Sequence, residues 1–348
     1  MDVRFWLGSA ARVWSAELRV RSCAGKRLAR RSMLALALAI FAGAALACPP
    51  PERPVVDYSG QFYYYGPPGD SKRDPEKYRR NAELRAPIYR FLDSVLSNAD
   101  EFVFKRDEGA RACAMTWLDA WAHGNAFLGR VTEQGRWERQ WTLASAALGY
   151  IKLGAGGRTA VDQRIERWMH KLAREVVTFD REERVLNNHH YYAGLAVGAT
   201  GVAFKNDALW DYARKVYHDA LAHMREDGAL PLELERGNRA ANYHQFAAGP
   251  LVTLARLSRL RGEDFFALGG GRIHRLVELS VRAFHDPNIM TQLNGSHQIR
   301  IMNIPWWPLY ATAFPKRAAA LPEPRHPPYD RHLGGGIAAL DAVLPLKR

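Results

Sequence analysis

The apolar residues of this chain repeat with a helical spacing from Pro75 onward. Tyr89, Leu92, Val95 and Leu96 fall on one face of a helix, because residues three and four apart are neighbours there. The same spacing predicts further helices at residues 115–122, 141–153, 161–177, 190–204, 209–224, 246–260 and 272–284. Short Gly or Asp-Gly breaks separate these segments, and none alternates like a strand. The pattern predicts an all-α protein.

The length of the chain limits how these helices can be arranged. With 348 residues, 47% of them hydrophobic, the chain can bury a large core. All-α proteins of this size form large bundles, solenoids or α/α toroids of helical hairpins. A solenoid requires a repeat of fixed period, and the sequence has none. A toroid is therefore favoured, preceded by an extended arm and loop at the Pro-, Gly- and Tyr-rich residues 49–70.

The first 47 residues have the pattern of an export signal. Four basic residues lie between positions 26 and 31, an apolar stretch occupies 33–46, and Ala-Leu-Ala at 45–47 matches the small residues before a cleavage site. We expect residues 1–47 to be a signal peptide and residues 48–348 to be a periplasmic or secreted catalytic domain without a membrane segment. An uncleaved membrane anchor is the alternative.

Cys48 would be the first residue of the mature chain. A cysteine at this position is typical of lipoproteins, although Ala45 stands where leucine is usual in their signal. The other interpretation is a disulfide with Cys113, because these two cysteines are the ones left after cleavage and the compartment is oxidising. We favour the disulfide, which would attach the N-terminal arm to a helix.

The charge of the chain points to an anionic partner. The net charge is +13, and about +7 remains after the signal segment with its eight basic and two acidic residues is removed. Polyanions in general fit this charge. However, the sequence has no zinc-ligand spacing, no RNA-binding signature and no basic block outside the N-terminus. Gly269, Gly270 and Gly271 lack the flanking strand of a nucleotide-binding loop. We expect no nucleic acid, metal or cofactor.

Two segments are more polar than their apolar surroundings. Residues 186–199 read LNNHHYYAGLAVGA, and residues 227–251 read DGALPLELERGNRAANYHQFAAGPL. Their polar residues are mainly His, Asn, Arg and Tyr, and neither segment is built around the carboxylate pair that glycoside hydrolysis usually requires. β-Elimination of a uronate chain has other needs: the C6 carboxylate is neutralised, the C5 proton is removed and O4 is protonated. Asn and Arg suit the first task, and His and Tyr suit the other two. Asn187 and Asn188 also suit simple helix capping.

These segments resemble the mannuronate-type alginate lyases of polysaccharide lyase family 5. The resemblance rests on NNHHYYAGLA at 187–196 and LPLELERGNRAANYHQFA at 230–247. The segments ARACAMTWLDAWA, RQWTLASAALGYIKL and RHLGGG are similar to further family segments, so the resemblance covers roughly residues 48–336. It implies an incomplete α/α toroid, a barrel of helical hairpins, with an N-terminal arm and a lid loop, β-elimination, and no metal or cofactor.

The resemblance also implies roles for individual residues. By position, Asn188 and Arg239 neutralise the carboxylate, and His189 acts as the base or shares that task. The catalytic tyrosine of the family, seven residues after the arginine, falls on Phe246, which cannot exchange a proton. Another phenol would then supply the acid, and Tyr243, one helical turn earlier, is our first candidate.

Other replacements for the family tyrosine are open. Tyr191 and Tyr192 also lie close in sequence to the motif, and His244 follows Tyr243 directly. The remaining alternative is that activity is lost, which would leave a non-catalytic binder of acidic polysaccharide. Retention of the asparagine, histidine and arginine favours an active enzyme.

The remaining site predictions concern the substrate. Tyr63, Tyr64, Tyr65 and Lys72 lie where the family has its lid, and aromatic and basic side chains there would stack on sugars and attract carboxylates. Tyr192, His244 and Arg331 complete the predicted substrate-binding set. For Arg331 the basis is a family segment with an arginine before LGG, although His332 occupies that position here. Sugar subsites could also be lined by Arg139 and by five tryptophans, but a core position is favoured for each: Trp117, Trp121, Trp141, Trp306 and Trp307.

The sequence thus predicts a lyase that acts on an acidic polysaccharide. Polymannuronate is the first candidate substrate, and polyglucuronate or hyaluronate-like chains are the alternatives. We expect the protein to be a monomer.

Overall fold

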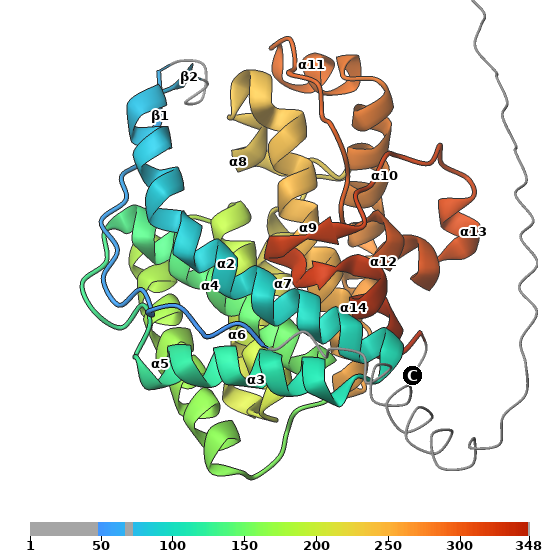
Figure 1. Ribbon diagram of the computed structural model, residues 1–348. Helices are drawn as coiled ribbons and strands as arrows, with labels where there is room; N and C mark the ends of the chain where they lie inside the picture. Colours follow the sequence, from blue (N-terminus) through green and yellow to red (C-terminus); the bar gives the residue numbers. More distant parts are fainter. Residues whose placement is uncertain (1–47, 67–71, 347–348) are drawn as a thin grey trace, which may run out of the picture. The chain divides into compact units, whose positions relative to one another are not determined.

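Four helical hairpins form the body of the protein. The computed structural model describes residues 48–66 and 72–346, so the predicted signal peptide at 1–47 lies outside the described residues. The long helices pair in chain order as α2 (Pro75–Lys105) with α3 (Glu108–His123), α4 (Glu133–Lys152) with α5 (Ala160–Glu183), α6 (Asn188–Ala203) with α7 (Asp207–His223), and α9 (Ala240–Ser258) with α10 (Arg272–His285). Figure 1 shows α2 and α3 side by side.

The hairpins are arranged as an incomplete α/α toroid. Helices α2, α4, α6 and α9 contact one another in that order, while α3, α5, α7 and α10 each pack on the preceding helix. Burial explains this order, because α4, α6 and α9 are apolar or buried on nearly all faces, whereas α5 and α10 bury one stripe. The C-terminal segment contacts both α9 and α2, so it takes the place of a further hairpin. The predicted fold is confirmed.

Short elements connect and complete the hairpins. The short helices are α8 (Pro231–Leu234), η1 (Gly237–Arg239), η2 (Arg259–Arg261), η3 (Phe265–Gly270), α11 (Asn288–Asn294), α12 (Trp307–Ala313), α13 (Pro315–Ala318), η4 (Arg331–Leu333) and α14 (Ile337–Val343). Two antiparallel two-stranded sheets pair β1 (Tyr64–Tyr65) with β2 (Lys72–Arg73) and β3 (Tyr329–Asp330) with β4 (Gly335–Gly336). In the described part of the chain, no helix is long and apolar enough to cross a bilayer.

Two glycines allow α6 to approach α7 closely. A Cβ atom added at Gly194 would lie 2.6 Å from Val216 Cγ1, and one at Gly198 would lie 2.7 Å from Ala213 Cβ. Ordinary side chains cannot occupy this space, so the tight packing of the hairpin depends on glycine. The N-terminus of α6 is thereby held within the ring of helices, where its first residues meet other helices.

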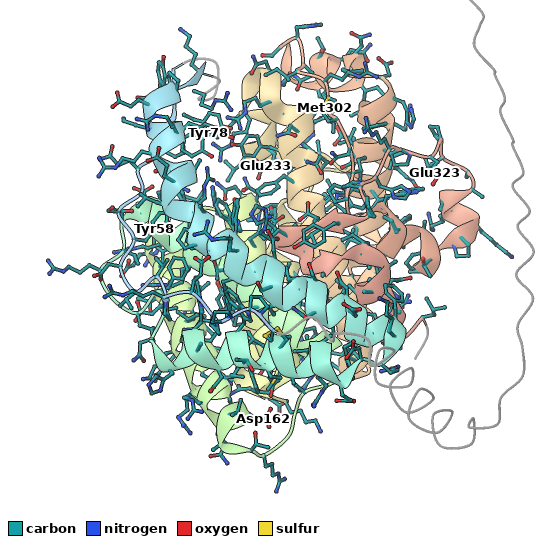
Figure 2. All side chains as sticks on the ribbon, viewed as in Figure 1. Tyr58, Tyr78, Asp162, Glu233, Met302 and Glu323 are labelled. Carbon is teal, nitrogen blue, oxygen red and sulfur yellow. A yellow bond between two sulfur atoms is a disulfide. The ribbon has the colours of Figure 1, made fainter. Side chains whose placement is uncertain are left out.

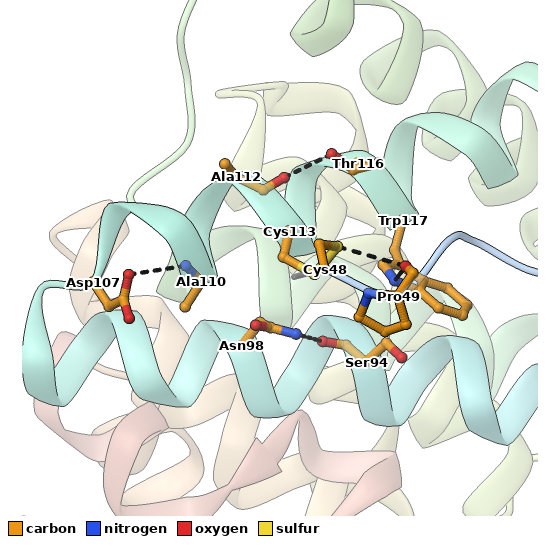
Figure 3. The surroundings of a disulfide bond; sticks show 10 residues. All are labelled: Cys48, Pro49, Ser94, Asn98, Asp107, Ala110, Ala112, Cys113, Thr116 and Trp117. Atoms are coloured by element: carbon orange, nitrogen blue, oxygen red, sulfur yellow. Dashed lines mark hydrogen bonds between the residues drawn. A yellow bond between two sulfur atoms is a disulfide. The ribbon is translucent and has the colours of Figure 1, made fainter. Parts of the chain in front are cut away.

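The N-terminal arm is attached by a disulfide, as predicted. Cys48 and Cys113 are bonded with an S–S distance of 2.04 Å, which joins the arm to α3 (Figure 3). Next to the bond, the Trp117 indole N–H donates to the carbonyl of Pro49 at 3.1 Å. The arm then runs extended to Tyr58, which forms an isolated bridge with Val131 before α4. The arm therefore reaches the sheet β1–β2 in a fixed path.

One helix boundary differs from the prediction in a way that affects the site. The helix expected at 246–260 begins at Ala240, so Tyr243, His244 and Phe246 belong to one continuous helix, α9. Residues three apart lie on the same face of a helix. Tyr243 and Phe246 therefore lie on the same face of α9.

Candidate active site

The predicted catalytic residues meet at one cavity of about 200 Å³. Its walls come from the arm and β1, from α2 and α4, from the N-terminus of α6, from η1 and α9, and from η4. The lining residues are Phe62, Tyr63, Tyr64, Arg85, Gln134, Trp137, Trp141, Asn188, His189, Arg239, Asn242, Tyr243, Phe246 and His332. Aromatic rings and a few cationic or amide groups dominate this list, which is a surface suited to an anionic sugar.

Asn187 and Asn188 have different functions at the start of α6. The Asn187 Oδ1 accepts from the backbone N–H of His189 at 2.9 Å, so this residue is the helix cap. Asn188 is fully buried and donates from its backbone N–H to Glu233 Oε1 at 2.6 Å and from Nδ2 to the same oxygen at 3.1 Å. Its Oδ1 has no hydrogen-bond partner within the described ranges. Asn188 is thus oriented by another residue and still has unused hydrogen-bonding capacity.

His189 is held by aromatic stacking rather than by an ion pair. Its ring stacks on Trp137 with centroids 4.4 Å apart, and Trp141 lies at 5.8 Å. Burial, together with the positive charge of Arg236, lowers the pKa of His189 to about 3. The imidazole is therefore neutral at neutral pH and able to accept a proton.

Arg239 and Tyr243 lie next to each other in the wall of the cavity. The Arg239 guanidinium lies 3.8 Å from the centre of the Tyr64 ring and 4.7 Å from that of Tyr243. Arg236 lies over the Tyr243 ring at 4.8 Å. Burial raises the pKa of Tyr243, although both arginines oppose the shift. The phenol therefore keeps its proton at neutral pH, as a general acid must.

A second cation enters the cavity from α2. Arg85 donates from Nε to the carbonyl of Asn81 at 3.2 Å and lies 3.5 Å from the buried carboxylate of Glu138. Burial raises the pKa of Glu138 to about 7, while Arg85 acts in the opposite direction. The Tyr63 ring lies 5.8 Å from the guanidinium. The cavity therefore presents two guanidinium groups, those of Arg85 and Arg239, to a ligand that carries several carboxylates.

Comparison with known proteins identifies the family. The model of the alginate lyase family matches residues 60–290. A polysaccharide lyase of Stenotrophomonas maltophilia (strain K279a) is 34% identical over 306 residues, which cover 85% of this chain and 91% of that protein. This chain belongs to the alginate lyase family. An alginate lyase of Cobetia marina is 34% identical over 196 residues, and this match covers 53% of the chain and 52% of that protein.

Solved structures show the same fold. The crystal structure of alginate lyase A1-III from Sphingomonas species A1 superposes with a TM-score of 0.71 at 21% identity, covering 84% of this chain and 85% of that one. A variant of A1-III complexed with a tetrasaccharide gives a TM-score of 0.74, also at 21% identity, and covers 84% and 86%. These two likenesses establish the toroid fold of the family for this chain.

The predicted substrate-binding residues divide between the cavity and the surface. Tyr63 and Tyr64 line the cavity from the lid side. Tyr65 and Lys72 pair with each other in the β1–β2 sheet, and both side chains are exposed outside the cavity lining. Their contact with substrate stays a prediction.

Three other predicted substrate contacts need correction. His244 is fully buried: its Nε2 accepts from the backbone N–H of Leu230 at 2.9 Å, so its Nδ1 carries the hydrogen donated to the carbonyl of Ala240 at 2.7 Å. Both ring nitrogens are thus used within the fold. Arg331 is engaged by Asp93 through two hydrogen bonds of 2.9 and 2.8 Å and does not line the cavity.

Tyr192 is the third correction. It is buried behind the cavity wall, with its ring 4.8 Å from that of Phe246. Tyr191 is buried as well and donates its hydroxyl hydrogen to the carbonyl of Leu186 at 3.0 Å. Among the three phenols considered as replacements for the family tyrosine, Tyr243 alone lines the cavity.

Several cavity residues were not predicted from the sequence. Arg85, Gln134 and Trp137 lie outside the two polar motifs, so no motif signal marks them. Trp141, interpreted as core, also lines the cavity, and so does His332, whose ring lies 5.4 Å from that of Trp141. Across the described ranges, no group of three or more His, Cys, Asp or Glu side chains is placed to hold a metal ion.

Proposed function

We propose that the protein cleaves a β-1,4-linked polyuronate, with polymannuronate as the first candidate, by β-elimination. Membership of the alginate lyase family gives the reaction class. The observation that carries the residue-level proposal is that Asn188, His189, Arg239 and Tyr243, from two separate motifs, line one cavity. Neutral imidazole, protonated phenol, amide and guanidinium are the groups this elimination needs.

The reaction would proceed through a stabilised carbanion at C5. Arg239 and Asn188 bind the C6 carboxylate and stabilise the negative charge that develops when the C5 proton leaves. His189 takes that proton. The C5 electron pair then forms the C4–C5 double bond as the C4–O4 bond breaks, and Tyr243 gives its proton to O4. His189 then gives its extra proton to solvent, and Tyr243 takes a proton from solvent, which restores both groups.

The low pKa of His189 fits this scheme once the substrate is present. The pKa of about 3 arises because burial and the charge of Arg236 disfavour the imidazolium. A bound uronate carboxylate brings negative charge close to the ring and favours the protonated form. Substrate binding therefore raises the basicity of His189 when a base is needed.

The decisive assay is formation of the unsaturated uronate, whose conjugated double bond absorbs in the ultraviolet. Purified residues 48–348 would be given polymannuronate, polyguluronate, polyglucuronate and hyaluronate separately. We expect absorbance to rise with polymannuronate. A rise with polyglucuronate or hyaluronate alone would reassign the substrate, and no rise with any of the four would contradict lyase activity on these chains.

We also propose that residues 1–47 direct export and are then removed, and that the mature protein acts as a monomer in the periplasm or outside the cell. The Cys48–Cys113 disulfide supports export, because such bonds persist in oxidising compartments. N-terminal sequencing of the exported protein should begin at Cys48. An intact N-terminus in the membrane fraction would indicate an anchor instead.

A further inference from the structure

A fully buried carboxylate lies directly behind the cavity. Glu233 of α8 has no exposed surface (Figure 2 labels it) and takes no part in the proton transfers above. Its Oε1 accepts the backbone N–H of Asn188 at 2.6 Å and the Nδ2 of the same residue at 3.1 Å, while Oε2 lies 3.3 Å from Nδ2. Burial of a carboxylate is unfavourable unless it is hydrogen-bonded, so this arrangement is specific to Asn188.

The contact joins the two halves of the active site. Asn188 and His189 begin α6, whereas Glu233 stands in the segment that continues into η1 and α9 with Arg239 and Tyr243. The residues are 45 positions apart in sequence, and all three of these hydrogen bonds from Asn188 end on this single carboxylate. Asn188 Oδ1 has no partner in the described structure, so its amide has capacity left for a ligand.

We infer that Glu233 is a positioning residue of the lyase reaction: its carboxylate fixes the side chain of Asn188 so that the amide meets the C6 carboxylate of the uronate. This inference rests on the proposed function. Glu233 does not touch the substrate, because Asn188 stands between it and the cavity and Glu233 is absent from the cavity lining. Glu233 therefore affects the rate only by orienting the side-chain amide of Asn188.

The ionised form of Glu233 is the one that holds Asn188. The charged and titratable groups that face it are Arg236, whose Nε lies 3.7 Å from Oε2, and the phenols of Tyr191 and Tyr243. Burial raises the pKa of Glu233 to about 7, and Arg236 and the hydrogen bonds from Asn188 oppose the shift. Below that pH the Glu233 carboxyl group carries a proton that points toward the N–H donors of Asn188 and Arg236. The hydrogen bonds between Glu233 and Asn188 are then weakened.

A double-mutant cycle tests the inference. Glu233→Gln keeps the shape but places an amide NH₂ where Asn188 Nδ2 and Arg236 Nε present their own hydrogens. We expect kcat on polymannuronate to fall about 10- to 100-fold, the loss seen at metal sites when a partner that orients a ligating side chain is removed, with KM little changed. In an Asn188→Ala background the same substitution should lower kcat less than about twofold, because the side chain through which Glu233 acts is already absent.

The pH dependence gives a second readout that a purely structural role would not affect. In the unmodified enzyme, kcat/KM should fall as pH decreases through about 7, well above the pKa of about 3 for His189. Glu233→Gln should remove this decrease, because glutamine does not titrate. Glu235→Gln is the matched control, since Glu235 is exposed on the same segment and lies outside the cavity lining, and it should leave the decrease in place.

The outcomes separate the inference from the proposed function. Unmodified enzyme that forms no unsaturated product at any pH contradicts the proposed function itself. If it is active, additive losses from the two substitutions, or a decrease near pH 7 that persists in Glu233→Gln, overturn the inference. The exposed Glu235→Gln on the same segment should behave as unmodified enzyme. If Glu233→Gln fails to fold, the pH profile of Asn188→Ala tests the inference. This variant should also lack the decrease in kcat/KM near pH 7, and a decrease that persists would overturn the inference.

Discussion

Replacement of Tyr243 by phenylalanine should remove the acid that protonates O4. The change deletes one hydroxyl group and keeps the ring, over which Arg239 and Arg236 lie at 4.7 and 4.8 Å. Since phenylalanine also attracts cations, we expect the free energy of unfolding to change by less than about 1 kcal/mol. General acid catalysis contributes about 10²- to 10⁴-fold, so kcat should fall by that factor. This corresponds to about 2.7 to 5.4 kcal/mol of barrier.

The assay is initial-rate formation of unsaturated uronate from polymannuronate, with urea unfolding of the same samples. Tyr191→Phe is the matched control: it removes a hydroxyl that donates to the Leu186 carbonyl and lies outside the cavity lining. It should reduce stability by about 1 kcal/mol and leave kcat unchanged. If Tyr243→Phe kept more than a third of kcat, the acid would have to be another group, and His332 would be the next to test because it also lines the cavity.

Other predictions follow from the same geometry. Arg239→Ala and His189→Ala should each lower kcat/KM at least about 100-fold in folded protein, and full activity in either variant would refute its role. Replacing both Cys48 and Cys113 by serine should reduce the free energy of unfolding by about 4 kcal/mol, since the bond closes a loop with a sequence separation of 65; equal urea midpoints would contradict this. Glu138→Gln should gain stability relative to the unmodified protein as pH rises from about 4.5 to about 7. The pKa of Glu138 in the folded protein, about 7, lies above its ordinary value. Between these two values the unfolded chain loses its proton while the folded protein keeps it, so rising pH disfavours folding by up to about 3 kcal/mol. Parallel pH–stability curves for the two proteins would refute this.

The sequence alone determined the all-α class and the order of the hairpins. Helical spacing and short breaks are local properties, so they can be recognised in the sequence without knowing which helices pack together. The two polar motifs stood out from their apolar surroundings, and the resemblance to the alginate lyases indicated Asn188, His189 and Arg239 within them, with Tyr243 as the nearest phenol to Phe246. Tyr243 lines the cavity together with Phe246, since three residues are close to one helical turn, and its role as the acid stays a prediction.

Spacing could not determine the direction of single side chains within the motifs. His244 follows Tyr243 directly, yet a rotation of about 100° per residue turns it into the core, where the Leu230 and Ala240 backbone groups use both ring nitrogens. Arg331 is drawn to Asp93, 238 residues earlier in the chain, a pairing that no local pattern reveals. Only the folded chain decides which neighbour of a motif faces the cavity.

The groups that support the site were likewise decided by tertiary structure. Arg85 depends on Glu138, and Asn188 depends on Glu233, across separations of 53 and 45 residues. Each glutamate is one of many acidic residues in the sequence, and nothing local marks it as buried. Sequence therefore indicated the groups that the two motifs bring to the site, but not the rest of the cavity lining. The packing of α2, α4, α6 and α8 determined how they are held, because a buried carboxylate takes its partner from whatever helix the fold places beside it.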